Sequence, residues 1–534
     1  MRTKTRKLRR MKRRDLLSTS ALVAVGAILG GVPGVARSDD PFGPDALIAR
    51  AQALAEQPHQ GAADALPPPF DSLDYDMYRA IRPRAGHAAG LDIGAQFQAD
   101  FLPPGWLFNT PVQISLPGRR ARVDFEPESF DFDPRYFPDG APQGPFPGLG
   151  HSGLRIRYPL NSPDRLDDLI VLQGASYFRA LARDVAYGLS ARGLALGTGG
   201  TGPEEFPVTR EIDVFDTSGG QLHFGCLIDS RRTAAALIVS LRPGNAENPE
   251  TVMQCDLHLF VREVVADIGI APLTSMFQHN ALGPARVDDF RPAVHDSDVL
   301  VVDNGAGERL WRPLANPVQV EMSGFQDDGP RAFGLLQMPD NFAAFRDAEG
   351  AYHRRPSAFV EPVGAWGKGA VWLLEIPTAN EYADNIVTFW RPLDPLQPGR
   401  AHRFRYDLRW TQPGLAALPE AAGLELLPVN SASGVNPEDI ASRLFVIDYA
   451  VAGDTPLPAP DDLELVIAQP EGAVISGQAL YRIEGERQKL RASFVLTPSE
   501  ASVRCELRMQ LRKAGRDIAP VWLYRWSRDV DGGP

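Results

Sequence analysis

Two segments in which apolar and polar residues strictly alternate constrain the fold of this chain most. They are TVMQCDLHLFVRE at 251–263 and ASVRCELRMQLRK at 501–513. A period of two places apolar side chains on one face of a strand and charged ones on the other. The segments 234–244, 331–338 and 369–378 are more continuously apolar, which indicates strands that are more fully buried. The sequence therefore predicts an all-β protein.

Helical patterns are scarce in comparison. The best candidates are 44–57 and 176–188, and the second ends at Gly188 as a helix with a glycine C-cap does. The high content of proline and glycine, 48 and 49 residues, fits a chain rich in strands and turns. We therefore expect short helices that decorate a β-sheet framework.

The chain is too long for a single core, since 534 residues predict about two to four domains. RPLDPLQPGR contains three prolines, which predicts a stiff linker at 392–400. We expect a large β-sandwich domain at 39–391 and a smaller sandwich at 401–534. In the smaller sandwich, 402–410 is the expected first strand and 521–526 the expected last.

The first 38 residues have the pattern of an export signal. A basic region with the pair Arg13-Arg14 precedes a moderately apolar stretch and the small residues around Ala36. The arginine pair is typical of twin-arginine export, so we expect a periplasmic protein. Beyond residue 37 the chain has 45 basic and 66 acidic residues, a net charge of −21. This charge argues against a nucleic-acid partner.

The cysteines and histidines indicate neither a metal site nor a cofactor. Cys226 and Cys255 are the one pair that could form a disulfide within a domain, but Cys255 and Cys505 alternate with apolar residues as core positions do. No cysteine or histidine spacing matches a zinc site. The acids at 296–303 lack the order of a calcium loop, and the glycine-rich run 197–202 lacks the Lys-Ser/Thr of a phosphate loop.

Two groups of acids stand among aromatic residues and are the candidates for chemistry. Asp296 and Asp298 lie in HDSDVLVVDNG, and Glu381 and Asp384 lie in EIPTANEYADNIVTFW. Either group could be a solvated turn. Alternatively, cleavage of a glycosidic bond needs a carboxylic acid and a second carboxylate, and aromatic rings suit the apolar faces of a sugar. The candidate substrate-binding residues are His295, Trp311, Tyr352, Arg354 and Trp366.

Eight sequence blocks, in one order, resemble the glucans biosynthesis protein G/D family of osmoregulated periplasmic glucan synthesis. They are 174–196, 204–207, 270–277, 289–298, 311–317, 333–337, 354–378 and 384–392. The signal segment resembles the D branch. The resemblance implies a galactose-mutarotase-like sandwich followed by an immunoglobulin-like one. It also implies a protein that shapes the β-1,2-linked glucose backbone, with some members similar to inverting endo-β-1,2-glucanases.

By this resemblance, Asp384 is the general acid and Asp296 the base, acting through a relay of water and substrate hydroxyls. Glu381 and Tyr352 support them. A proton donor needs a shielded carboxyl, and we expect Asp384 to be buried beside the apolar residues at 386–390. An inverting site with a water between the two carboxyl groups needs a separation of about 6.5–9.5 Å.

Three functions stay open from the sequence: an endo-β-1,2-glucan hydrolase, a transglycosylase that cyclises or extends glucan, and a non-catalytic partner of the membrane-bound synthesis machinery. A polysaccharide lyase is a more distant alternative. The oligomeric state is open, with a homodimer as one option. The chain departs from the family pattern at Gln278-His279-Asn280, at Val299 and in the Gly-rich loop 197–203. These departures lie on loops that could line the cleft and alter its access to water.

Overall fold

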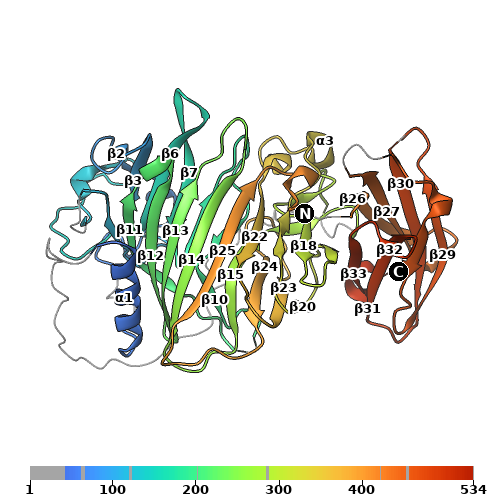
Figure 1. Ribbon diagram of the computed structural model, residues 1–534. Coiled ribbons are helices and arrows are strands. Elements are labelled where there is room, and N and C mark those ends of the chain that lie inside the picture. The colour runs from blue at the N-terminus through green and yellow to red at the C-terminus, as the bar shows by residue number, and fades with distance from the viewer. Residues whose placement is uncertain are drawn as a thin grey trace, which may run out of the picture. The chain divides into compact units, whose positions relative to one another are not determined.

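The computed structural model describes residues 42–532 except 62–65, 119–122, 201, 284–287, 421–422, 453–455 and 487. Strands dominate these residues and form several sandwich-like sheets, which confirms the all-β prediction (Figure 1). Within the same residues, no helix has the length and hydropathy needed to span a membrane. The predicted signal at 1–38 lies outside the described residues.

Two large sheets enclose the main core. One contains, in spatial order, β2 (Leu91–Gly94), β3 (Phe97–Leu102), β6 (Gly153–Ser162), β7 (Arg165–Gln173), β8 (Tyr177–Ala180), β9 (Ser190–Arg192), β15 (Ile268–Ser275), β24 (Ile386–Pro392), β23 (Gly369–Glu375) and β20 (Glu321–Asp327), with β10 (Leu194–Leu196) beside β15. The other contains β28 (Glu464–Ile467), β31 (Arg504–Lys513), β33 (Val521–Ser527), β19 (Arg309–Pro313), β18 (Val299–Asp303), β21 (Ala332–Leu336), β22 (Ser357–Val363), β25 (His402–Thr411), β14 (Thr251–Val261), β13 (Thr233–Arg242), β12 (Leu222–Asp229), β11 (Val208–Asp216) and β4 (Gln113–Ser115), with β32 (Arg516–Asp517) beside β31.

Smaller elements complete the described residues. A further sheet has the order β26 (Leu426–Asn436), β27 (Asp439–Val451), β30 (Lys489–Pro498) and β29 (Ala473–Arg482). Two strand pairs are β1 (Ile81–Pro83) with β5 (Phe130–Phe132) and β16 (Phe277–His279) with β17 (Val294–His295). The helices are α1 (Pro44–Ala55), α2 (Tyr75–Arg79), α3 (Phe342–Phe345) and α4 (Arg528–Asp531), with 3-10 turns η2 (Pro127–Ser129), η3 (Ser218–Gly220), η4 (Tyr352–Arg354), η5 (Leu415–Ala417) and η6 (Pro460–Asp462).

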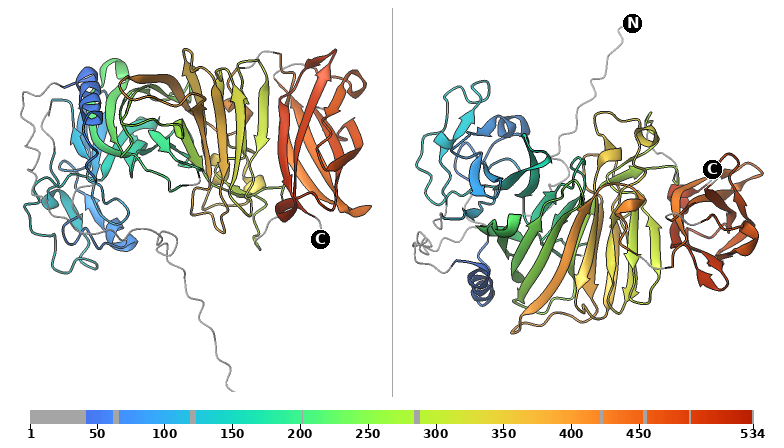
Figure 2. Two further views of the ribbon diagram at one scale, coloured as in Figure 1. Left: turned by 90° about the horizontal axis from the view of Figure 1, so that it is seen from below. Right: turned by 45° about the horizontal axis from the view of Figure 1, so that its top comes forward.

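A second core explains why some strands are apolar throughout. In β18, Leu300 and Val302 belong to the core between the large sheets, whereas Val299 and Val301 belong to a separate core with β27, β30, β31 and β33. Both faces of β18 are therefore buried, and period two disappears from its sequence. Both views of Figure 2 show the orange-to-red strands of residues 426–527 gathered as one group. The immunoglobulin-like type of this group and the domain boundaries stay predictions.

The strand predicted to begin the C-terminal sandwich lies elsewhere. β25 pairs with β14 on one side and β22 on the other, as Figure 1 shows, so this part of the prediction is wrong. Its alternating residues, from Phe404 to Trp410, point into the main core because β25 continues the larger sheet. The prolines at 391–400 connect β24 of one large sheet to β25 of the other, and Leu396 pairs there with Val265.

One of the two predicted helices is confirmed. α1 spans Pro44–Ala55 and packs on β12 and β13. The helix predicted at 176–188 is wrong, because β8 pairs with β7 and β9 at its start. The apolar residues of 176–188 are spaced as in a helix only because the turn after β8 is buried as well. A side chain at Gly188 would come within 3.0 Å of Arg355 Cβ, so this glycine permits close approach to that residue.

All three cysteines are buried and free, which confirms the interpretation of them as core residues. Burial raises the pKa of the Cys226 thiol to about 12 and also raises the pKa of Cys255. Cys226 and Cys255 stand on β12 and β14, with β13 between them.

Candidate functional site

The candidate site lies where β16 and β17 meet the turn between β23 and β24. Phe277 of β16 is opposite His295 of β17, and Asp296 follows directly. Asn385 fastens the turn 376–385 to this pair, because its side-chain oxygen accepts from the Phe277 amide at 2.8 Å and its side-chain nitrogen donates to the Phe277 carbonyl at 2.9 Å. The two segments with acids that the sequence analysis selected are therefore held together.

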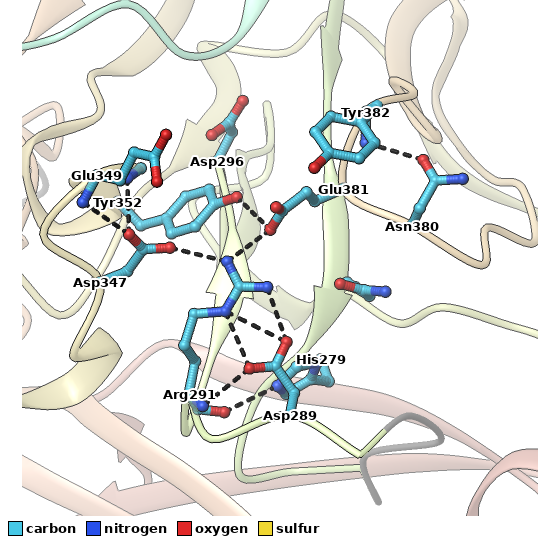
Figure 3. A network of polar contacts seen from close by, with 12 residues as sticks. His279, Asp289, Arg291, Asp296, Asp347, Glu349, Tyr352, Asn380, Glu381 and Tyr382 are labelled. Carbon is cyan, nitrogen blue, oxygen red and sulfur yellow. Dashed lines mark hydrogen bonds and ion pairs between the residues drawn. The ribbon is translucent and has the colours of Figure 1, made fainter. Parts of the chain in front are cut away.

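Arg291 joins carboxylates from three segments of the chain (Figure 3). Its guanidinium donates to Glu381 at 2.6 Å, to Asp347 at 2.7 Å and to Asp289 at 2.7 Å. The Tyr352 hydroxyl donates to the same Glu381 oxygen at 2.8 Å. We call these five residues the Arg291 cluster. The cluster brings Glu381 into contact with Arg291 and Tyr352, which keeps the turn 376–385 in place.

The charge of Arg291 controls the protonation of its neighbours. The hydrogen bonds from Arg291 lower the pKa of Asp289 to about 2. The pKa of Asp347 is also lowered, because hydrogen bonds and the charge of Arg291 outweigh burial, the largest single effect, which acts in the opposite direction. Burial and then the Glu381 carboxylate raise the pKa of the Tyr352 phenol, so Tyr352 is a hydrogen-bond donor at neutral pH.

We expect Tyr352→Phe to lower the free energy of unfolding by about 1–3 kcal/mol, since a charge-assisted hydrogen bond is lost and Tyr352 is only 4% exposed. Chemical denaturation measures this change. Tyr136→Phe, at a ring that is 39% exposed, is the matched control and should leave stability almost unchanged. Equal effects from the two variants would contradict a positioning role for Tyr352.

Asp296 is a buried carboxyl outside the bonded network of Figure 3. It is 8% exposed, and its Oδ1 lies 3.5 Å from Arg355 Nε without forming a hydrogen bond within the described residues. Burial raises the pKa of Asp296 to about 6, with Arg355 opposing this shift and the charges of Asp384 and Glu381 adding to it. Asp296 and Asp384 are therefore close enough to interact electrostatically.

The predicted burial of Asp384 is wrong. Its side chain is 31% exposed, and its Oδ2 lies 3.8 Å from Arg179 Nη2. The residues expected to cover it, Ile386 to Trp390, form β24 and point into cores instead, whereas Asp384 precedes the strand. Asp384 thus faces the solvent beside an arginine from β8.

The predicted substrate-binding residues divide between the site and the cores. Arg354 is exposed and contacts the Asp184 carbonyl at 3.5 Å, and Arg355 rather than Arg354 lies beside Asp296. Trp366 is 8% exposed in the main core, where its indole donates to the Arg405 carbonyl at 3.1 Å. The structure does not bring Arg354 or Trp366 to the carboxylates, so neither is carried into the proposed site.

His295 and Trp311 are each only 1% exposed. His295 stacks on Phe277 with a ring separation of 5.5 Å, and burial lowers the pKa of the imidazole to about 3. Neither side chain is exposed to an approaching polymer, because each has almost no accessible surface. The structure therefore places these two predicted residues in the protein interior.

Among the departures from the family pattern, Gln278 and His279 of β16 contact the site, whereas Val299 lies in β18 in the second core and not on a loop. Gln278 donates to the Ala379 carbonyl at 3.3 Å, and a ring nitrogen of His279 lies 3.1 Å from the Arg291 carbonyl. Arg291, Asp289 and Asp347 were not predicted from the sequence as site residues. The first two stand in the quoted block 289–298, but the contact with Asp347 joins positions 56 residues apart, which no local pattern reveals.

The arrangement offers two carboxyl groups of different exposure, as separate acid and base roles require. Burial raises the pKa of Asp296 to about 6, whereas the Asp384 side chain is 31% exposed and open to a ligand. Within the described ranges, no three or more His, Cys, Asp or Glu side chains are grouped to hold a metal ion.

The chain is similar over most of its length to proteins of periplasmic glucan biosynthesis. A family model described as "Periplasmic glucan biosynthesis protein, MdoG" matches residues 42–526. Glucans biosynthesis protein G of Vibrio cholerae is 41% identical over 498 residues, which cover 91% of this chain and 87% of the relative. Its counterpart in Shewanella frigidimarina is 39% identical over 496 residues, with 91% and 85% covered. Both relatives have the name G, and the D branch favoured above stays a prediction.

Proposed function

Because this chain belongs to the periplasmic glucan biosynthesis protein family, we propose that it shapes the glucose backbone of osmoregulated periplasmic glucans by inverting endo-β-1,2-glucanase chemistry. The family match supports glucan as the substrate class and the periplasm as the compartment. Export through a twin-arginine signal at 1–38 is part of this proposal. So is a functional association with the inner-membrane synthesis machinery.

The observation that carries the reaction is a buried carboxyl group, Asp296, whose raised pKa reflects burial and in part the charge of the exposed Asp384. In the proposed step, Asp384 donates its proton to the leaving glycosidic oxygen as the bond from that oxygen to the anomeric carbon breaks. A water oxygen bonds to the same carbon from the opposite face, and its proton passes to Asp296 directly or through a substrate hydroxyl. With a pKa of about 6, Asp296 is mostly ionised at pH 7 and is a stronger base than an ordinary aspartate.

Glucan binding itself would complete the acid site. The Asp384 side chain is 31% exposed in the free protein, so a bound chain must cover it before it can act as a shielded proton donor. Glu381 and Tyr352 hold the turn on which Asp384 stands. The low exposure of Asp296 supports a second candidate, transfer to a sugar hydroxyl in place of water, with larger or cyclic glucans as products.

The test is incubation of the mature protein with linear β-1,2-glucan, followed by analysis of reducing ends and product masses. We expect new reducing ends, and a loss of roughly 10²-fold or more in Asp384→Asn with glucan binding retained. Asp328→Asn, at a side chain that is 76% exposed, is the matched control. Rings or longer chains would identify transfer. Glucan binding without any product from the unaltered protein would reject the enzymatic proposal in favour of a binding partner.

A further inference from the structure

The turn 376–385, which carries Asp384, is fastened at its start by a buried asparagine. The side-chain nitrogen of Asn316 donates to the Thr378 carbonyl at 2.9 Å, and its side-chain oxygen accepts from the Thr378 amide at 3.0 Å. Asn316 is buried in the segment that follows β19, so water does not readily replace these bonds. The turn is therefore held near its start by Asn316, as it is held at its end by Asn385.

A buried ion pair lies directly before this turn. Glu375, the last residue of β23, accepts from Arg312 of β19 at 3.1 Å and from the Ala315 amide at 2.7 Å. β23 and β19 belong to different large sheets, so these bonds join the sheets where the turn begins. Burial raises the pKa of Glu375, and the charge of Arg312 opposes this shift. Desolvation thus offsets much of the attraction within the pair.

The strand β33 contacts the same charges. It pairs in parallel with β19, and its Tyr524 ring lies 5.8 Å from the Arg312 guanidinium. Arg525 of β33 donates at 3.2 Å to Glu321, which stands opposite Glu375 in the pairing of β20 with β23. Glu321 raises the pKa of Glu375 and Arg525 lowers it, so β33 favours the ionised form of the pair. Because Tyr524 belongs to the second core, that core reaches the charges at the start of the turn.

We propose that Arg312, Glu375 and Asn316 are positioning residues for the turn 376–385, and that β33 contributes to the site by keeping Arg312 in place. A buried ion pair adds little net stability, so its main effect here is to fix the end of β23. A displacement of about 1 Å at a reacting group can cost roughly 10²-fold in rate. The inference rests on the proposed function, in which Asp384 is the proton donor, and these residues act through the turn rather than on the glucan.

The test compares two double variants that each remove a buried ion pair of β19. Arg312→Met with Glu375→Met removes the pair at the start of the turn, and Arg309→Met with Asp303→Leu removes the pair at the other end of the strand. Hydrogen exchange is measured by mass spectrometry on peptides that cover 376–385, relative to peptides of β14. We expect exchange in the turn to rise at least about tenfold in the first variant and less than about twofold in the second.

The contribution of β33 is measured in the same way with two tyrosine variants. Tyr524→Leu and Tyr449→Leu each remove a buried ring from the second core, and the Tyr524 ring is the one over Arg312. We expect faster exchange in the turn 376–385 in Tyr524→Leu alone. In the glucan assay, Arg312→Met with Glu375→Met should lower kcat at least about tenfold and change KM less than about threefold, because the turn is displaced while the binding surface is retained.

Three results would overturn the positioning role. They are unchanged exchange in Arg312→Met with Glu375→Met, an equal rise in both double variants, and an equal rise in both tyrosine variants. The exchange measurement needs no glucan, so it decides the role even if the unaltered protein forms no product. Products from the unaltered protein, with kcat unchanged in Arg312→Met with Glu375→Met, would reject this inference and leave the proposed function intact.

Discussion

Asp296→Asn should abolish product formation from β-1,2-glucan and yet make the folded protein more stable at pH 7. Activity should fall by roughly 10²- to 10⁴-fold, because the variant has no base to receive the proton of water. Stability should rise because the native protein holds an ionised carboxylate that is 8% exposed and has no hydrogen bond to its Oδ1. A pKa raised from 3.8 to about 6 corresponds to about 2–3 kcal/mol at pH 7.

The pH dependence of this gain has a defined direction. Below pH 3.8 Asp296 is protonated in both the folded and the unfolded chain, so the variant gains nothing there. Between pH 3.8 and about 6 the folded chain retains a proton that the unfolded chain has lost, and the stability of the unaltered protein falls as pH rises. The stability difference between variant and unaltered protein should therefore appear over this window and then level off.

Denaturation curves of both proteins measure this difference. They are recorded at a series of pH values from roughly 3.5 to 8, so that the range brackets the window. Asp328→Asn, at a side chain that is 76% exposed, is the control and should leave stability almost unchanged. A variant that is inactive but no more stable at pH 7 would show that Asp296 is not a strained buried charge. A fully active variant would remove Asp296 from the reaction.

The sequence predicted correctly a strand that buries one face against a core and exposes the other to solvent. It failed where the same pattern allows a strand to join either of two sheets. β14 alternates because one face meets the core and the other meets solvent, and its prediction was correct. β25 alternates in the same way, but alternation does not specify which sheet a strand joins. The prolines at 391–400 indicated a domain linker, although a connection between facing sheets needs an extended chain just as much.

The same limit applies to the site. Asp296, Glu381 and Asp384 were found because acids are rare among apolar strand residues, and the structure places them in one region. The exposure of each carboxyl group could not be predicted, because it depends on which neighbouring side chains cover it. Glu375, in the same motif, is 1% exposed and bound to Arg312 at 3.1 Å. Asp384 faces solvent. Trp366 was selected as an aromatic residue near acids, and an indole suits a core equally well.

Arg291→Met should be the most destabilising single change in the site. It preserves much of the apolar stem but leaves Asp289, Asp347 and Glu381 without their shared cation, with the Arg291 side chain only 15% exposed. Removing one partner of a buried ion pair costs on the order of 3 kcal/mol, because the remaining charges stay desolvated. Glucan activity should also fall, since Glu381 would no longer hold the turn before Asp384.

Arg403→Met is the control that separates burial from charge. Arg403 donates to both oxygens of Asp256, at 2.8 and 2.7 Å, but its side chain is 53% exposed, so we expect a loss below about 1 kcal/mol.

The pH dependence of the Arg291→Met effect is a second criterion. Asp289 has its pKa lowered to about 2 by Arg291, so this pair contributes stability above about pH 4 that is lost as pH falls toward 2. The deficit of Arg291→Met should therefore be largest near pH 7 and shrink on acidification. Equal losses in the two variants, or a deficit independent of pH, would mean that solvent rather than Arg291 balances these carboxylates.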